Sequence, residues 1–238
     1  MNIKKHIPNI LTLLNLFCGC IALVFLTKGN FEAAFYSVCL GIFFDFFDGF
    51  FARKFNVSGP LGVQLDSLAD MVTSGVVPGF MMYGVLSNPY VLGNSYWSYA
   101  GFAITVGSCY RLANFNIDTR QTDSFIGLPT PANSLFFMSL PFVFEKFKES
   151  IFSETFFNSY VLIALCFLSA YVMNAEIPLF SLKIKQFSFA KYKLQISFLL
   201  LSLVLLLLLK VVAVPIIIVL YVVLSVVNNM MNSKKLHG

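Results

Sequence analysis

The stretch FFDFFDGFFARKFNVSGPLGVQLDSLADMV, residues 43–72, places four aspartates among phenylalanines and leucines. The whole chain has only 11 acidic residues among 238, and 58% of its residues are hydrophobic. A charged aspartate at the centre of a membrane helix costs roughly 2.5–3.5 kcal/mol, and neighbouring like charges add repulsion. Carboxylates concentrated in so apolar a sequence therefore indicate a functional site.

The composition around this stretch is that of a membrane protein, since only 11% of the residues are charged. About eight apolar runs approach 20 residues in length, with centres near residues 17, 40, 77, 103, 140, 165, 203 and 220. The last two could form one helix, but it would be roughly 45 Å long against a hydrocarbon core of about 30 Å. Lys210 and Pro215 therefore indicate a tight hairpin between two short spans.

These runs predict an all-α fold, a polytopic transmembrane helix bundle of about eight spans. We expect residues 1–238 to form a single integral membrane domain. Its catalytic core should cover about residues 7–178, with two additional C-terminal spans over about residues 194–230.

The distribution of basic residues predicts the orientation in the membrane. If the N-terminus lies in the cytoplasm, 12 of the 16 lysines and arginines are cytoplasmic. The other four are Lys28, Lys146, Lys148 and Lys210. We therefore expect both termini on the cytoplasmic side of the cell membrane, with the active site facing the cytoplasm. The distribution of lysine and arginine among the loops matters more here than the net charge of +5, and no nucleic-acid partner is predicted.

The spacing of the aspartates predicts that they converge. Asp45 and Asp48 are three residues apart near the end of the second span, and Asp66 and Asp70 are four apart at the start of the third. On helices, each pair shares one face. By the helical rise, Asp45 and Asp48 lie about 12 Å and about 7.5 Å below Arg53. The cluster should therefore lie in the cytoplasmic third of the membrane.

Four carboxylates without histidine or cysteine form a hard oxygen site that suits Mg²⁺ or Mn²⁺. Mg²⁺ usually shares its coordination with substrate phosphates. Gly49 and Gly62 accompany the aspartates and would let a ligand approach the backbone closely, although each could instead serve helix packing. The pattern indicates phosphoryl-type chemistry at the depth of lipid headgroups.

Eight residues of this stretch resemble the signature of the CDP-alcohol phosphotransferase family at every fixed position. They are Asp45-x2-Asp48-Gly49-x2-Ala52-Arg53-x8-Gly62-x3-Asp66-x3-Asp70. Three further segments are similar to the bacterial and archaeal members that use serine: IPNILTLLNLFCG (residues 7–19), LDSLADMVTSGVVPG (65–79) and YRLANFNIDTRQTDSFIGLPTPAN (110–133).

The resemblance implies transfer of a phosphatidyl group from CDP-diacylglycerol to L-serine, giving phosphatidylserine and CMP. It also implies that Asp45, Asp48 and Asp66 bind a centre of two Mg²⁺ or Mn²⁺ ions. Asp70 then shares in this centre or acts as the base that deprotonates the serine hydroxyl. Metal ions can stabilise charge on the diphosphate and the departing CMP, while a carboxylate activates the alcohol. The family further implies a homodimer.

The resemblance also suggests where the substrates bind. It places the nucleotide among the first three helices, near the residues Asn9, Thr12, Gly49, Ala52, Arg53 and Gly62. The alternative for Asn9 and Thr12 is a helix N-cap and a first-turn hydroxyl after Pro8. For the serine carboxylate, Arg111 is the first candidate and Arg120 the second; the alternative for both is anchoring at the cytoplasmic interface.

Two other functions fit the aspartates. A related enzyme could use glycerol 3-phosphate or inositol as the acceptor, and only the flanking segments favour serine. A divalent-cation transporter would also keep carboxylates in the membrane, but near its midplane along a pathway.

Overall fold

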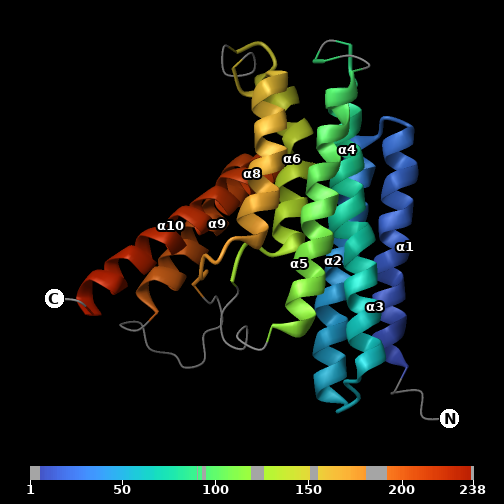
Figure 1. Ribbon diagram of the computed structural model, residues 1–238, viewed down its shortest axis with the longest axis vertical. Coiled ribbons are helices and arrows are strands. Elements are labelled where there is room, and N and C mark those ends of the chain that lie inside the picture. Colours follow the sequence, from blue (N-terminus) through green and yellow to red (C-terminus); the bar gives the residue numbers. More distant parts are fainter. Residues whose placement is uncertain are drawn as a thin grey trace.

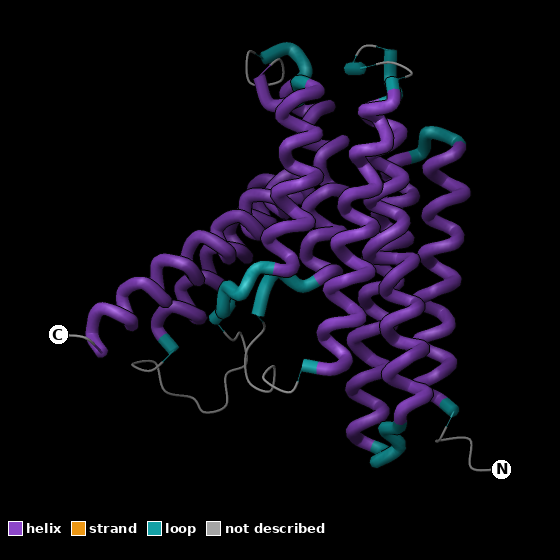
Figure 2. Tube along the Cα trace, in the orientation of Figure 1, coloured by secondary structure: helices purple, strands orange, loops and turns teal. Residues whose placement is uncertain are grey.

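The computed structural model describes residues 6–89, 91–92, 95–118, 126–150, 155–180 and 192–236, with side chains up to residue 231. Throughout these residues the regular structure is helical (Figures 1 and 2). The extended segments among them form a single antiparallel bridge, between Ile126 and Pro178. The predicted all-α fold is confirmed.

Three long helical rods form the N-terminal half of the bundle. α1 (Ile7–Thr27) is followed by α2 (Phe31–Lys54). The third rod joins α3 (Pro60–Asp70), a π-helical turn, η2 (Met71–Val76), and α4 (Val77–Leu86) without a break. α1 lies against both α2 and α3, and Figure 1 shows the rods side by side.

Local sequence signals explain where these helices begin. Pro8 and Pro60 occupy the first turns of α1 and α3, where the missing backbone N–H has no intrahelical partner to lose. The side chain of Asn30 caps α2 by accepting a hydrogen bond from the Ala33 backbone N–H at 3.0 Å. Gly29, with φ of +69°, makes the turn between α1 and α2.

The second half of the bundle packs against these rods. A 3₁₀ turn, η3 (Tyr96–Phe102), leads into α5 (Ala103–Ile117), and α6 (Thr130–Phe147) and α8 (Ser159–Asn174) follow. Fully buried apolar side chains of α4, α5, α6 and α8, among them Met81, Ile104, Phe137 and Leu162, form one core with residues of α1 and α2 such as Ala22 and Val38. This core fixes the placement of α4, α5, α6 and α8 against the first two helices.

The last two helices form a hairpin. α9 (Lys193–Leu209) and α10 (Ala213–Leu236) are joined by a short 3₁₀ turn, η4 (Lys210–Val212), and Lys210 has φ of +53°. The rings of Phe198 and Tyr221 lie 5.6 Å apart, whereas a straight helix would separate these residues by roughly 34 Å. The predicted chain reversal is confirmed, and Figure 1 shows the hairpin slanting away from the bundle.

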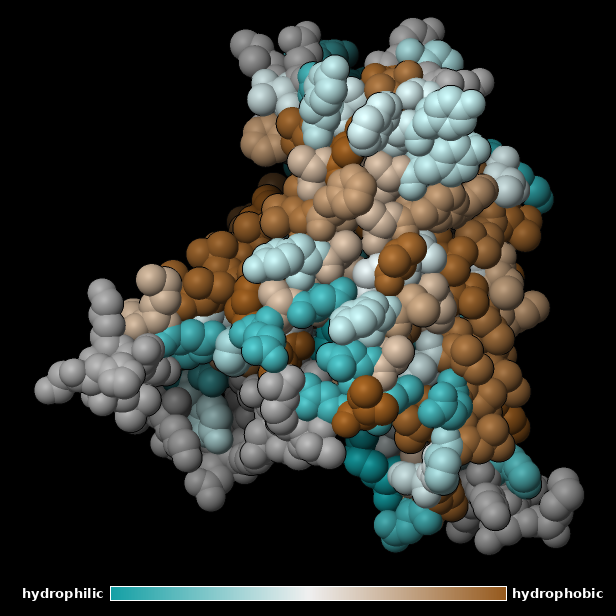
Figure 3. Space-filling model, viewed as in Figure 1, coloured by the Kyte–Doolittle hydropathy of each residue, from teal (hydrophilic) through white to brown (hydrophobic). Residues whose placement is uncertain are grey.

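Among the described residues, four helical stretches are long and apolar enough to cross a membrane: Ile7–Thr27, Phe31–Lys54, Pro60–Leu86 and Lys193–Met231. The last of these contains the reversal between α9 and α10. Figure 3 shows hydrophobic side chains along the α1 side of the bundle and over the hairpin. The fold is therefore that of a membrane helix bundle, while the count of eight spans and their orientation stay predictions.

Candidate active site

The structure brings the predicted carboxylates together where α2 and α3 face each other. One oxygen from each of Asp45, Asp48 and Asp66 lies within 4.8 Å of the other two. The spacing of three and four residues places each pair on one helical face, and the packing of α2 and α3 on α1 turns these faces inward. The fourth aspartate, Asp70, is buried but does not belong to this group of three.

These three carboxylates fit a metal ion. Asp45 Oδ1 is buried and has no hydrogen-bond partner in the part of the chain that the structure describes. A buried carboxylate oxygen left in this state is costly unless a cation compensates it. The donor set consists of oxygens alone, which is the preference of Mg²⁺ and Mn²⁺.

Thr12 of α1 holds one of these carboxylates. Its hydroxyl donates to Asp48 Oδ2 at 2.5 Å and also lies 3.1 Å from the Pro8 carbonyl oxygen. Thr12 therefore has a role beyond that of a first-turn hydroxyl. The N-cap of α1 is His6, so the alternative that Asn9 caps the helix is wrong. Asn9 instead faces α3, with Oδ1 3.7 Å from the point where a side chain on Gly62 would begin.

Asp70 is held separately, by a residue that sequence reasoning missed. Asn15 of α1 donates a hydrogen bond from Nδ2 to Asp70 Oδ1 at 3.0 Å, and Asn15 is completely buried. The sequence contained a signal that Asn15 faces the site, because Asn15 follows Thr12 by three residues and so shares its helical face. A polar residue in an apolar span also indicates function by itself.

The π-helical turn η2, which starts directly after Asp70, was also missed. Its residue Thr73 donates a hydrogen bond to the Asn15 carbonyl oxygen at 3.0 Å. A side chain at Gly19 of α1 or Gly41 of α2 would collide with Thr73. These glycines allow η2 to lie close to both helices, and π-helical turns are frequent at functional sites. Pro78, two residues after η2, was an available signal, because inside a continuous helical rod it has no backbone N–H to bond the Ser74 carbonyl oxygen.

All six predicted nucleotide-binding residues line one cavity of about 170 Å³ between α1, α2 and α3. These residues are Asn9, Thr12, Gly49, Ala52, Arg53 and Gly62. Asp48 and Asp66 also line this cavity. At Gly49 a side chain would begin only 3.3 Å from Arg53 Nη1, so the glycine leaves room for the guanidinium.

A larger cavity of about 600 Å³ adjoins the first and is lined by all four aspartates. Asp48, Gly49, Arg53 and Asp66 line both cavities, so the carboxylates lie between them. Arg111 of α5 also lines the larger cavity; it is 5% exposed, and its guanidinium lies 5.3 Å from the centre of the Phe115 ring. The second acceptor candidate, Arg120, lies outside the described residues.

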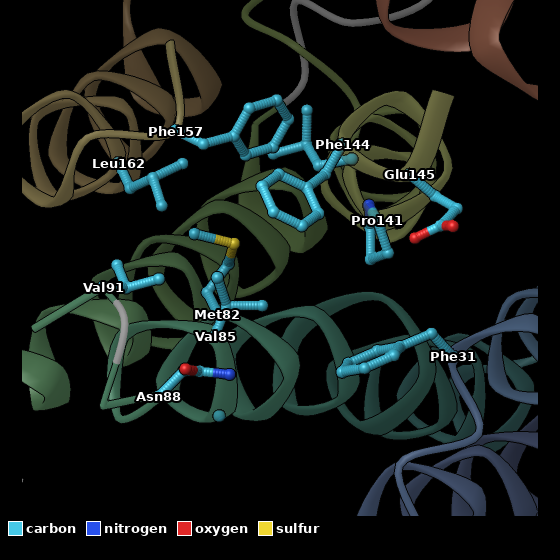
Figure 4. A pocket seen from close by; sticks show the side chains of 12 residues that line it. Phe31, Met82, Val85, Asn88, Val91, Pro141, Phe144, Glu145, Phe157 and Leu162 are labelled. Atoms are coloured by element: carbon cyan, nitrogen blue, oxygen red, sulfur yellow. The ribbon is translucent and has the colours of Figure 1, made fainter. Parts of the chain in front are cut away.

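A third cavity, of about 460 Å³, lies away from the aspartates. It is formed by the start of α2 and by α4, α6 and α8, and Figure 4 shows Met82, Phe144 and Phe157 pointing into it. Phe31, which also lines it, is separated from Asp48 by roughly 25 Å along α2. Its lining is mostly apolar, so it offers no comparable chemistry.

A membrane helix bundle that carries a carboxylate cluster between two cavities is suited to metal-assisted transfer of a phosphate-bearing group. The family model for CDP-alcohol phosphatidyltransferase matches residues 5–179. The chain therefore belongs to the CDP-alcohol phosphatidyltransferase family of enzymes, as its signature predicted. The match ends before α9 begins.

Curated relatives point to one branch of this family. A CDP-diacylglycerol–serine O-phosphatidyltransferase of Bacillus subtilis (strain 168) is 36% identical over 151 residues, covering 62% of this chain and 81% of that protein. A Helicobacter pylori (strain J99) protein of the same name is 34% identical over 127 residues, which are 52% of each chain. The archaetidylserine synthase of Methanothermobacter thermautotrophicus is 30% identical over 139 residues, covering 55% of this chain and 58% of that protein.

Proposed function

We propose that the protein transfers a phosphatidyl group from CDP-diacylglycerol to L-serine, giving phosphatidylserine and CMP. The observation that carries this proposal is the position of the three grouped carboxylates, which lie between a small cavity and a larger one. The small cavity contains the residues expected to bind the nucleotide, and the larger one contains the buried cation Arg111. The names of the similar bacterial proteins support serine as the acceptor.

Asp45, Asp48 and Asp66 would hold the metal, with Asp70 beside them. When bound, two Mg²⁺ or Mn²⁺ ions would neutralise charge on the diphosphate and on the departing CMP. Thr12 contributes by donating its hydroxyl hydrogen to Asp48, which leaves the other oxygen of that carboxylate for another partner. The orphaned Oδ1 of Asp45 supports the same assignment.

The nucleotide end of the lipid would occupy the smaller cavity. Gly49 and Gly62 present backbone without side chains, so the nucleotide can approach α2 and α3 closely. Arg53 borders both cavities and can donate hydrogen bonds to the diphosphate between them. Asn9 supplies an amide for polar contacts with the nucleotide.

The acceptor would enter the larger cavity. Asp70 serves as the base: it takes the proton of the serine hydroxyl while the serine oxygen bonds to the phosphatidyl phosphorus and the bond to CMP breaks. Asn15 orients Asp70 from α1 for this task. Arg111 would pair with the serine carboxylate, and its burial strengthens such a pair because little water competes.

The same proposal includes the arrangement in the membrane. We infer eight spans: α1, α2, the rod from α3 to α4, η3 with α5, α6, α8, α9 and α10. Both termini would be cytoplasmic, the site would open to the cytoplasmic side of the cell membrane, and two copies would associate as a homodimer. The excess of basic residues in the predicted cytoplasmic segments supports this orientation.

An acceptor panel tests the function. Purified protein in lipid nanodiscs is incubated with CDP-diacylglycerol, a divalent metal and labelled L-serine, glycerol 3-phosphate or inositol. We expect CMP release and labelled lipid with serine alone, loss of both after chelation, and recovery with Mg²⁺ or Mn²⁺. Faster transfer to either of the other alcohols would contradict serine specificity while leaving the family reaction intact.

A further inference from the structure

The hairpin of α9 and α10 lies beyond the residues that match the family, yet it is bonded to the core. The turn η4 and α10 both lie against α6. α10 also lies against the extended segment that follows α8. Figure 1 shows this meeting point beside the end of α8, on the side of the bundle toward the C-terminus. The contacts there suggest what the hairpin does.

Three side chains of α10 hold the segment of residues 178–180. Asn229 Nδ2 donates to the Pro178 carbonyl oxygen at 2.6 Å, and Tyr221 Oη donates to the Phe180 carbonyl oxygen at 2.9 Å. The Phe180 backbone N–H donates to Ser225 Oγ at 3.3 Å. Residues 221, 225 and 229 are spaced four apart, so they lie along one face of α10.

Aromatic packing strengthens this attachment. The Phe180 ring lies 4.9 Å from the Tyr221 ring and 5.7 Å from the Phe198 ring, in both cases edge to face. Both helices of the hairpin therefore contact the residue whose backbone α10 binds. The segment is held by packing as well as by hydrogen bonds.

The held segment is in turn paired with the chain that leads into α6. The Gly127 backbone N–H donates to the Ile177 carbonyl oxygen at 2.9 Å, and Ile126 forms an antiparallel bridge with Pro178. The Leu128 backbone N–H donates to the last turn of α8 at 3.2 Å. Figure 2 shows the two extended segments side by side between the hairpin and the bundle.

This pairing leaves little freedom to residues 126–131. Gly127 has φ of +75°, and a side chain there would collide with the Met173 carbonyl oxygen. Pro129 follows with φ of −61° and begins α6. The next residues, Thr130 and Pro131, line the carboxylate cavity together with Pro129. A displacement of the paired segments would therefore move one wall of that cavity.

We propose that the α9–α10 hairpin positions the acceptor wall of the carboxylate cavity, defined here as residues 129–131. Tyr221, Ser225 and Asn229 act through the paired segments and are positioning residues. The inference rests on the proposed function, which assigns this cavity to the acceptor. The smaller cavity is built from α1, α2, α3 and the turn between α2 and α3, so the hairpin should affect the acceptor more than the CDP-lipid.

The test compares the KM of each substrate in full-length variants. Tyr221→Phe removes one hydroxyl and keeps the ring packing, and Asn229→Ala removes the amide. Each should raise the KM for the acceptor roughly fivefold, which corresponds to about 1 kcal/mol, the typical contribution of one hydrogen bond. The double variant should raise it further, while the KM for CDP-diacylglycerol changes less than about twofold.

Ser225→Ala has a matched control in Ser197→Ala on α9, since the Ser197 hydroxyl donates to carbonyls of its own helix. Ser225→Ala should raise the acceptor KM and Ser197→Ala should not. An unchanged acceptor KM in all three α10 variants, or an equal rise for both substrates, would overturn the proposal. The variants are measured with whichever alcohol the wild-type protein uses in the acceptor panel. A wrong assignment of serine as the acceptor would therefore show in the wild type, whereas a wrong role for the hairpin would show only in the variants.

Discussion

The hydrogen bond between Asn15 and Asp70 allows a prediction that separates an effect on turnover from an effect on stability. Asn15→Leu keeps a side chain of similar size and removes the amide that donates to Asp70 at 3.0 Å. Asn15 Oδ1 is buried and has no hydrogen-bond partner among the described residues, but the substitution also leaves the buried Asp70 Oδ1 without its donor, which costs about 1–3 kcal/mol. We therefore expect the melting temperature to fall.

Turnover should fall in the same variant. A hydrogen bond to a charged group contributes about 1.5–3 kcal/mol. If that energy serves to orient Asp70 in the transition state, kcat should fall roughly 10- to 150-fold. The KM for CDP-diacylglycerol should change little, because Asn15 does not line the nucleotide cavity.

The assay follows CMP release by purified protein, with the folded fraction measured by fluorescence-detected size exclusion. Asn174→Leu is the control, because the Asn174 amide donates to the carbonyl oxygens of Gly107 and Ala170 and to no aspartate. That variant should lower the melting temperature and leave kcat per folded molecule unchanged. An Asn15→Leu enzyme with wild-type kcat would refute the assigned role of Asn15.

Three further predictions concern the carboxylates, the acceptor and the topology. Asp45→Asn should weaken metal-dependent binding of the CDP-lipid and abolish turnover, whereas Asp70→Asn should retain more binding while losing most of the rate; equal losses of affinity would remove the distinct role of Asp70. Arg111→Lys should raise the KM for serine roughly tenfold through loss of bidentate geometry, and Arg111→Ala should raise it more; unchanged serine kinetics would leave Arg111 as an interfacial anchor. Single cysteines at Asn2 and His237, in a background without other cysteines, should resist impermeant thiol reagents in intact cells and react after permeabilisation; labelling from outside would reject the predicted orientation.

The sequence alone determined the fold class, the reversal at Lys210 and the convergence of Asp45, Asp48 and Asp66. Each of these follows from short-range regularities: the length of apolar runs, the excess length of the last one, and spacings of three and four residues on helices. The resemblance to the family signature also selected six residues that share one cavity. Local geometry was sufficient in these cases because helices joined by a short connection are usually adjacent in space, which brings the residues near that connection together.

Only the tertiary structure separated Asp70 from the other three carboxylates. The spacing of four residues predicts that Asp66 and Asp70 share a face, but it carries no information about the side chains opposite them. The packing of α1 provides Thr12 for Asp48 and Asn15 for Asp70. The close approach of the following π-helical turn to α1 and α2 depends on Gly19 and Gly41 of those two helices, so no local pattern could specify that packing.

The tertiary structure also decided which parts of the chain build the acceptor side. Arg111 shares a cavity with the aspartates because the bundle places α5 beside α3 and next to the start of α6. The connection from the C-terminal hairpin to residues 126–131 depends on backbone pairing between segments about fifty residues apart. Such pairing depends on how the helices before and after the two segments pack in the bundle, whereas sequence periodicity indicates only which face each helix buries.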